Sequence, residues 1–258
     1  MEDRARAHRA RLAPYVEPHL ARRQAGIKHP VHDFLFTYYS FRPAQLLRWT
    51  PGLPASDPLV TDRRALIEQI HELLVATTGR AGNFGCFGLH EWAMVHGAAA
   101  NRHPMPLRLG ADETDAVTES HRIACSHFDA FRFFTPSARS FNTLSPRADD
   151  RASYEQPACL HGGMDLYKHA FRLSPLISSD LVADAFELAW EIRILDMRAA
   201  PYDMTGWTLD PTGEPWTPVR IETAEGKAEY VAAQRRLAER GAPIRARLIE
   251  ECERLLRC

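Results

Sequence analysis

The chain lacks a long apolar segment, because no apolar run in its 258 residues reaches the ~18 residues that a membrane span requires. Its opening string, MEDRARAHRARL, also lacks the apolar core of a secretory signal. Lysine is scarce, with only Lys28, Lys168 and Lys227 among 32 basic side chains, and the net charge is −1. This balance excludes general electrostatic attraction to nucleic acid and leaves only a local basic face for that purpose. We therefore expect a cytoplasmic protein that does not enter a membrane.

Cysteine pairs and several common catalytic motifs are also absent. The five cysteines are an odd number and include no CxxC, so we expect free thiols in a reducing compartment. The chain has no GxSxG nucleophile elbow, no P-loop and no GxGxxG dinucleotide motif. The string HEWAMVH (90–96) places its histidines six residues apart instead of four, which excludes the zincin pattern.

Helical periodicity dominates what remains. Apolar residues recur at helical spacing over 62–78 and 180–198, and a third helical pattern over 88–99 follows a glycine-rich turn. No regular alternation of strands and helices is present, which argues against a doubly wound sheet. The sequence predicts a mainly α fold, with a single helical domain over 1–258.

Proline-rich stretches separate the predicted helices. They cover 50–60, 101–115, 135–158 and 199–220. Because proline restricts the backbone, we expect these stretches to be long, ordered loops. At most a few short strands are expected, at 105–109 and 121–127.

Both ends of the chain are predicted to be helical. Residues 1–28 carry an excess of four positive charges and form a basic helical arm, broken near its two prolines. This arm faces either solvent or phosphates. Residues 224–258 form a C-terminal helix pair, since Gly241 can end one helix and Pro243 can begin the next.

Histidine, acidic, basic and aromatic residues concentrate in five segments, which we name the five polar–aromatic segments. They are 29–43, 86–96, 125–134, 159–171 and 196–203. Each buried polar group left without a partner costs about 1–3 kcal/mol, so a core built only for stability would not contain so many. We therefore expect these segments to converge on one cavity or to pair with one another.

The first two segments combine aromatic rings with charge. Tyr38 and Tyr39 next to Arg42 suit a flat ring that is stacked and held by charge, or else a tyrosine-rich core. His90 next to Trp92 is either a core histidine or a metal ligand.

The next two segments offer acid–base and ligand chemistry. Asp129 and Arg132 stand three residues apart and can pair on a helix, but a carboxylate among phenylalanines is also a candidate general base. His161 and Asp165 stand four apart, a spacing that fits metal ligation or a histidine oriented by the carboxylate. Lys168 is a phosphate contact, an amine nucleophile or a surface lysine.

Six long strings carry the most distinctive patterns of the chain: HPVHDFLFTYYSFRP, CFGLHEWAMVH, SHFDAFRFFTP, QPACLHGGMDLYKHAF, LDMRAAPYD and PVRIETAEGKAEYVAAQR. These strings resemble a bacterial family usually named 3-methyladenine DNA glycosylase. The resemblance covers essentially the whole chain. It implies a DNA-repair enzyme that hydrolyses the C1′–N bond of an alkylated purine in damaged DNA, with no cofactor.

That reaction requires the base to leave the stack and to be held between aromatic faces, near cationic side chains that bind phosphates. The candidates for these substrate contacts are Tyr38, Tyr39, Arg42, Trp92, Arg132, Phe133, Lys168 and Arg198. A carboxylate must stabilise the oxocarbenium-like sugar and activate water, as in glycosidases. Asp129 and Asp165 are the candidate carboxylates, and His127 or His161 orients the water.

An alternative function rests on the large number of histidines, 12 in a nearly neutral chain. Two histidines and a carboxylate with open coordination positions suit a non-haem iron or zinc enzyme that acts on a small metabolite. The candidate ligands are His90, His127, His161 and Asp165.

Overall fold

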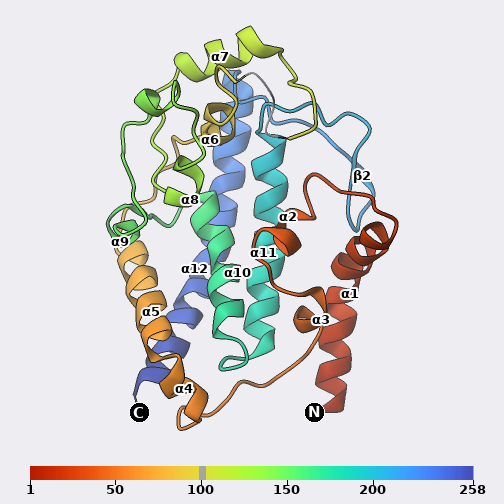
Figure 1. The fold of residues 1–258 in the computed structure, drawn as a ribbon, viewed down its shortest axis with the longest axis vertical. Coiled ribbons are helices and arrows are strands. Elements are labelled where there is room, and N and C mark those ends of the chain that lie inside the picture. Colours follow the sequence, from red (N-terminus) through yellow and green to blue (C-terminus); the bar gives the residue numbers. More distant parts are fainter. Residues whose placement is uncertain (99–102, 258) are drawn as a thin grey trace.

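Four long helices form the centre of the computed structural model, which describes residues 1–98 and 103–257. They are α5 (Arg64–Thr78), α10 (Leu160–Leu173), α11 (Ser179–Arg198) and α12 (Ala224–Leu256). Helix α10 packs against α11, and α12 contacts α5, α10 and α11 (Figure 1). Helix α1 (Glu2–Gln24) contacts α11 on the side of the molecule opposite α5.

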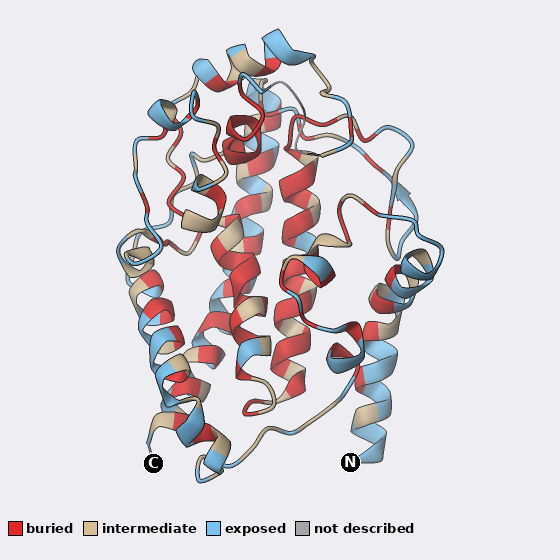
Figure 2. Cartoon of the chain, in the orientation of Figure 1, coloured by how far each residue is buried: buried red, intermediate tan, exposed pale blue. Residues whose placement is uncertain are grey.

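Helices α10 and α11 are buried along most of their length (Figure 2). Large apolar residues such as Leu166, Phe186 and Trp190 fill the space around them. A Cβ atom at Gly163 would lie 2.6 Å from Ile192 Cδ1, so glycine at this position lets the two helices approach closely. These two helices carry several of the ionisable residues discussed below, among them Asp165 and Asp196.

The mainly α fold predicted from the sequence is confirmed. Within the described residues, the strands are limited to β1 (Thr208–Leu209) and β2 (Glu214–Pro215), which pair antiparallel. None of the described helices is both long enough and apolar enough to cross a membrane.

The predicted C-terminal helix pair is wrong, because α12 is one helix of 33 residues that includes Gly241 and Pro243. Both halves bury apolar residues on the same side, such as Leu237 and Leu248. Gly241 itself faces Leu188 and Leu166. Packing along this continuous face offsets the ~3 kcal/mol that a proline costs inside a helix.

The predicted break in the N-terminal arm is also wrong. Helix α1 runs through Pro14 and Pro18 without interruption. Leu12 and Val16 are fully buried on one side of it, and this packing keeps the helix together across the prolines.

The proline-rich stretches and the segments next to them contain short helical elements. These are α2 (Phe34–Thr37), α3 (Pro43–Leu46), α4 (Pro58–Asp62), α6 (Leu89–Ala93), α7 (Ala111–Glu119), α8 (Phe128–Phe131), α9 (Arg151–Tyr154) and a 3-10 turn at Arg139–Phe141. The helix predicted over 88–99 is therefore reduced to α6, and position 99 lies outside the described residues. The strands predicted at 105–109 and 121–127 are reduced to two isolated bridges, from Leu107 to Tyr202 and from Ile123 to Asn142.

Candidate functional site

The five polar–aromatic segments meet in space, although about 150 residues of sequence separate the first from the last. The Tyr39 hydroxyl of the first segment donates to Asp165 of the fourth at 3.1 Å. Lys168 of the fourth donates to Asp129 of the third, also at 3.1 Å. His90 of the second lies 3.0 Å from Asp196 of the fifth. The expectation that these segments converge is confirmed.

A cavity of about 260 Å³ lies at this meeting point. It is lined by Phe34, Thr37, Tyr38, Glu91, Met94, His103, Asp129, Phe133, His161 and Arg193. The Phe34 and Tyr38 rings stack with their centroids 4.8 Å apart and provide one flat wall. The volume of the cavity is just below the ~300–1,000 Å³ of typical small-molecule sites. It therefore suits a ligand the size of one heterocyclic base.

Asp165 lies beside the cavity and is saturated with donors. It accepts from Tyr39 through Oδ1, and its Oδ2 lies 2.7 Å from Arg151, 3.2 Å from Lys168 and 3.3 Å from His127. Burial acts to raise the pKa of Asp165, but the hydrogen bond and charge of His127 and the charge of Lys168 lower it well below the usual value. Asp165 therefore stays ionised and holds other side chains in place.

Asp129, in α8, occupies the rim of the cavity. Its carboxylate contacts Lys168 at 3.1 Å and Arg132 at 3.3 Å, so the pair predicted three residues apart is present. The Arg132 guanidinium lies 4.5 Å from the centroid of the Phe133 ring and donates to the Tyr38 hydroxyl. The rim thus combines a carboxylate, a cation and two aromatic rings.

Glu91 lines the cavity, although the sequence offered it only as one of several possible metal ligands and not as a catalytic or substrate-binding residue. It is buried in the short helix α6, and its Oε2 has no hydrogen-bond partner among the described residues. The nearest cation is Arg193, 3.7 Å from Oε1. The only signal in the sequence was its place in the second segment, which offered no reason to prefer it over His90.

His90, His161 and Asp196 form a second group at the inner wall of the cavity. The His90 and His161 rings are edge-to-face, with centroids 4.4 Å apart. Burial acts to lower the pKa of His90, but the charge of Asp196 raises it to about 10. Burial and the neighbouring His90 lower the pKa of His161 well below its usual value. A neutral imidazole therefore lies next to a charged one.

The remaining predicted residues divide into two sets. Tyr39, His127, Arg132, Asp165 and Lys168 support the cavity without lining it. The predicted substrate contacts Trp92, Arg42 and Arg198 are not at the cavity wall. Trp92 is fully buried and donates its indole N–H to the Ala199 carbonyl. Arg42 is an exposed residue that precedes α3. Arg198 binds Thr217 and Glu229.

The four ligands of the metal alternative are also divided. His90 and His161 lie with Asp196 in a group whose ligand atoms are all within 4.8 Å of one another. His127 instead pairs with Asp165, and its ring centroid is 5.4 Å from that of His161. The carboxylate near the two histidines thus comes from α11 and not from the predicted position four residues after His161.

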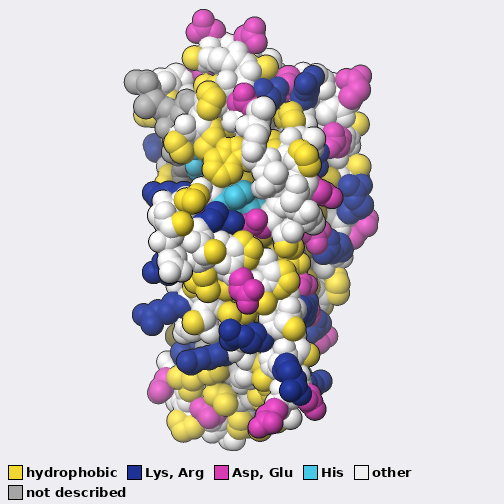
Figure 3. All heavy atoms as spheres, turned by 90° about the vertical axis from the view of Figure 1, so that its right-hand side faces the viewer, with side chains coloured by type: hydrophobic (Ala, Val, Ile, Leu, Met, Phe, Trp, Pro, Cys, Tyr) yellow, Lys and Arg dark blue, Asp and Glu magenta, His cyan; other side chains and the backbone are white. Residues whose placement is uncertain are grey.

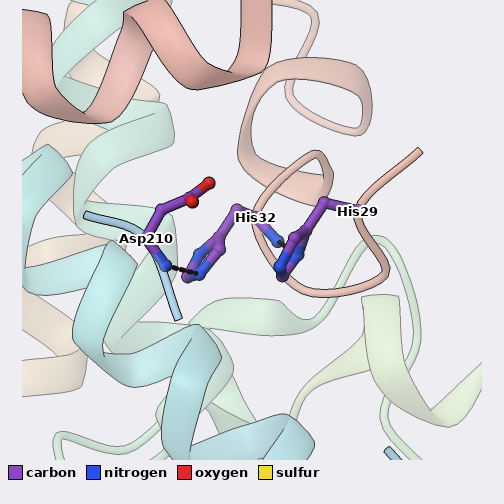
Figure 4. Close-up of side chains that lie close together, drawn as sticks. All are labelled: His29, His32 and Asp210. Carbon is purple, nitrogen blue, oxygen red and sulfur yellow. Dashed lines mark hydrogen bonds between the residues drawn. The ribbon is translucent and has the colours of Figure 1, made fainter. Parts of the chain in front are cut away.

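A second histidine group with the same composition lies elsewhere, at His29, His32 and Asp210 (Figure 4). His29 Nε2 contacts the Thr208 carbonyl, and its Nδ1 accepts from the backbone N–H of His32. His32 Nε2 accepts from the backbone N–H of Asp210, the dashed contact in Figure 4. The Asp210 carboxylate binds Arg22. These contacts occupy both ring nitrogens of His29, the Nε2 of His32 and the carboxylate of Asp210, and among the described residues only His32 Nδ1 is left without a hydrogen-bond partner.

The surface carries both signs of charge in close alternation. Arg11 binds Asp184 and Glu187, and Arg240 binds Glu191. On the face drawn in Figure 3, Lys and Arg side chains lie among Asp and Glu side chains. Any contact with a polyanion would therefore depend on a few local cations, such as Arg132 at the cavity rim.

Comparison of the chain with protein-family models, curated proteins and solved structures gave no significant match. The family resemblance therefore stays a prediction from the sequence.

Proposed function

We propose that this chain hydrolyses the C1′–N bond between a sugar and an alkylated purine base, the reaction of a DNA-repair N-glycosylase. The observation that carries the proposal is the cavity itself, which combines flat aromatic walls with two carboxylates, Glu91 and Asp129. Glycosidic hydrolysis needs a site for a planar leaving group and a carboxylate near the sugar carbon.

The aromatic walls favour a flat and positively charged ring. Phe34 and Tyr38 form one stacked pair, and Phe133 lines the same cavity. An alkylated purine is cationic, and a cation near an aromatic face gains about 0.5–2 kcal/mol. Glu91 adds a negative charge within the cavity, with one carboxylate oxygen that has no partner in the described part of the chain.

The two carboxylates differ in exposure, which suggests different roles. The Glu91 side chain is 6% exposed and belongs with the base, where it attracts the positive ring. The Asp129 side chain is 19% exposed and is held by Lys168 and Arg132 at the rim, where the sugar and a water molecule have access. In this arrangement Asp129 activates the water and stabilises the oxocarbenium-like sugar.

The test is release of free base from methylated duplex DNA, followed by chromatography. Asp129→Asn should lower the rate by about 100-fold or more, because it removes the carboxylate that activates water and stabilises the sugar in the transition state, whereas Glu91→Gln should raise KM, because it removes the charge that attracts the cationic base. Glu187→Gln, which removes a surface carboxylate bound to Arg11, is the matched control and should retain the wild-type rate.

The same base-release assay is repeated with methylated nucleosides as the second substrate. Release from nucleosides but not from duplex DNA would retain N-glycosidic hydrolysis and replace DNA by a small molecule as the substrate. No release from either substrate, or equal rates in the wild type and Asp129→Asn, would overturn the proposal.

A further inference from the structure

We propose that His90, His161 and Asp196 bind one divalent transition-metal ion of the Zn²⁺ or Fe²⁺ class at the inner wall of the cavity. This site goes beyond the proposed hydrolysis and does not depend on it. The three side chains come from α6, the first turn of α10 and the last turn of α11, so the tertiary fold alone brings them together.

The spacing of the ligand atoms suits one ion. Each side chain offers an atom within 4.8 Å of the others, and His90 Nε2 is 3.0 Å from Asp196 Oδ1. Ligand atoms at ~2.0–2.2 Å from a zinc or iron ion are themselves roughly 3–3.5 Å apart. Small rotations of the side chains would therefore complete the coordination.

The buried polar atoms of this group lack other partners. Within the described residues, His90 Nε2 and Asp196 Oδ1 form an ion pair with each other at 3.0 Å, but neither makes an aligned hydrogen bond, although both side chains are almost completely buried. Leaving such atoms without a partner costs about 1–3 kcal/mol each. A metal ion that displaces the proton of His90 would bind both atoms at once, and that proton would be released to the solvent.

The surroundings support the ligands in the way that outer contacts support known metal sites. Arg193 donates to Asp196 Oδ2 at 2.8 Å, which orients the carboxylate and leaves Oδ1 for the ion. Cys86 lines a small neighbouring pocket together with His90 and His161. The Arg193 charge next to the site is balanced by Glu91 as well as by Asp196.

Two histidines and one carboxylate leave coordination positions open. His161 also lines the cavity, so these positions are close to any molecule bound there. Imidazole and carboxylate ligands select Zn²⁺, Fe²⁺ or Co²⁺ over the harder Mg²⁺, which prefers an all-oxygen shell.

The experiment measures metal binding directly, without substrate, so it is independent of base release. Full-length protein is stripped with a chelator and titrated with Zn²⁺ by calorimetry and with Co²⁺ by visible absorption. We expect one ion per chain and no binding of Mg²⁺. His161→Ala should lower the affinity by about 100-fold or more, since it removes a ligand that faces the cavity.

The matched control is His32→Ala, which alters the other group of two histidines and an aspartate and should leave the affinity unchanged. Asp196→Asn is the second ligand variant, and circular dichroism checks that each variant folds. Wild type that binds no stoichiometric ion would overturn the proposal, as would His161→Ala with unchanged affinity. A thiolate charge-transfer band with Co²⁺ would assign the ion to the nearby cysteines and would also overturn it.

Discussion

Two groups with the same composition, two histidines and an aspartate, differ in what their ligand atoms already do. In the His29–His32–Asp210 group, backbone groups bind both ring nitrogens of His29 and the Nε2 of His32, and the His32 and Trp190 ring centroids are 4.1 Å apart. Only His32 Nδ1 has no hydrogen-bond partner there among the described residues. In the His90–His161–Asp196 group, His90 Nε2 and Asp196 Oδ1 contact each other at 3.0 Å without an aligned hydrogen bond to any described residue, and the His161 ring faces a cavity. Equal composition therefore does not indicate equal function, because the contacts already made by each atom decide which group can bind a ligand.

The largest expected difference concerns the two aspartates. Asp196→Asn should lower the free energy of unfolding by about 3–5 kcal/mol, because it leaves the buried charges of His90 and Arg193 without their counter-ion. Asp210→Asn should cost about 1 kcal/mol or less, since the carboxylate only pairs with Arg22 near the surface and the backbone N–H still serves His32. Urea unfolding measures the free energy of unfolding of both variants. Equal losses in the two variants would contradict the difference that we expect between the groups.

For the histidines we expect the opposite order, with the larger loss of stability in the His29–His32–Asp210 group. His32→Ala removes a ring stacked on Trp190 and leaves the Asp210 N–H without its acceptor, so a loss of about 3 kcal/mol is expected. His161→Ala should cost about 1 kcal/mol, because part of this ring faces the cavity instead of the core. The same unfolding measurement decides the order, and a larger loss for His161→Ala would show that its ring is structural.

Added metal should stabilise only one of the two groups. At a Zn²⁺ concentration about 100 times the dissociation constant, the wild type should gain about 2.7 kcal/mol, because the ion binds the folded state. His32→Ala should keep this gain from its lower starting stability, whereas His161→Ala should lose it. Thermal unfolding with and without Zn²⁺ provides the measurement, and an equal gain in both variants contradicts the proposed site.

The smallest expected effect is a change in pH dependence at His32. Burial, then the charges of His29, Arg22 and Arg193, lower the pKa of His32 to about 2, so the folded state keeps this ring neutral. Below its usual pKa of ~6.5 the unfolded state binds a proton that the folded state does not, so stability falls as the pH falls. Between pH 6.5 and 5 this amounts to about 1.6 kcal/mol. His32→Gln should reduce the loss by that amount, and an unchanged slope would contradict the neutral ring.

Local patterns were sufficient to predict the long helices that position the site. The apolar spacing over 180–198 matches α11 (Ser179–Arg198), and the pattern over 62–78 contains α5 (Arg64–Thr78). Both patterns succeed because helical periodicity is a property of neighbouring residues. The breaks expected in α1 and α12 fail because the cost of a proline is local, whereas the packing that offsets it comes from other elements.

The sequence also predicted only part of the candidate site. Tyr38, Asp129, Phe133 and His161 were predicted from residue type and do line the cavity. Asp165 was predicted from its spacing, but its oxygens are occupied by donors from three other elements and by Lys168. Spacing along a helix shows which residues share a face, but it does not show which neighbours that face will meet.

The sequence by itself determined the helical architecture and the five segments in which reactive side chains concentrate, since both depend on residue type and local spacing. The tertiary structure alone decided that Glu91 reaches the cavity with an unpartnered oxygen and that Asp196, instead of Asp165, joins His90 and His161. The physical reason is that hydrogen bonds and ion pairs between remote segments determine which polar atoms are satisfied and which remain available for chemistry.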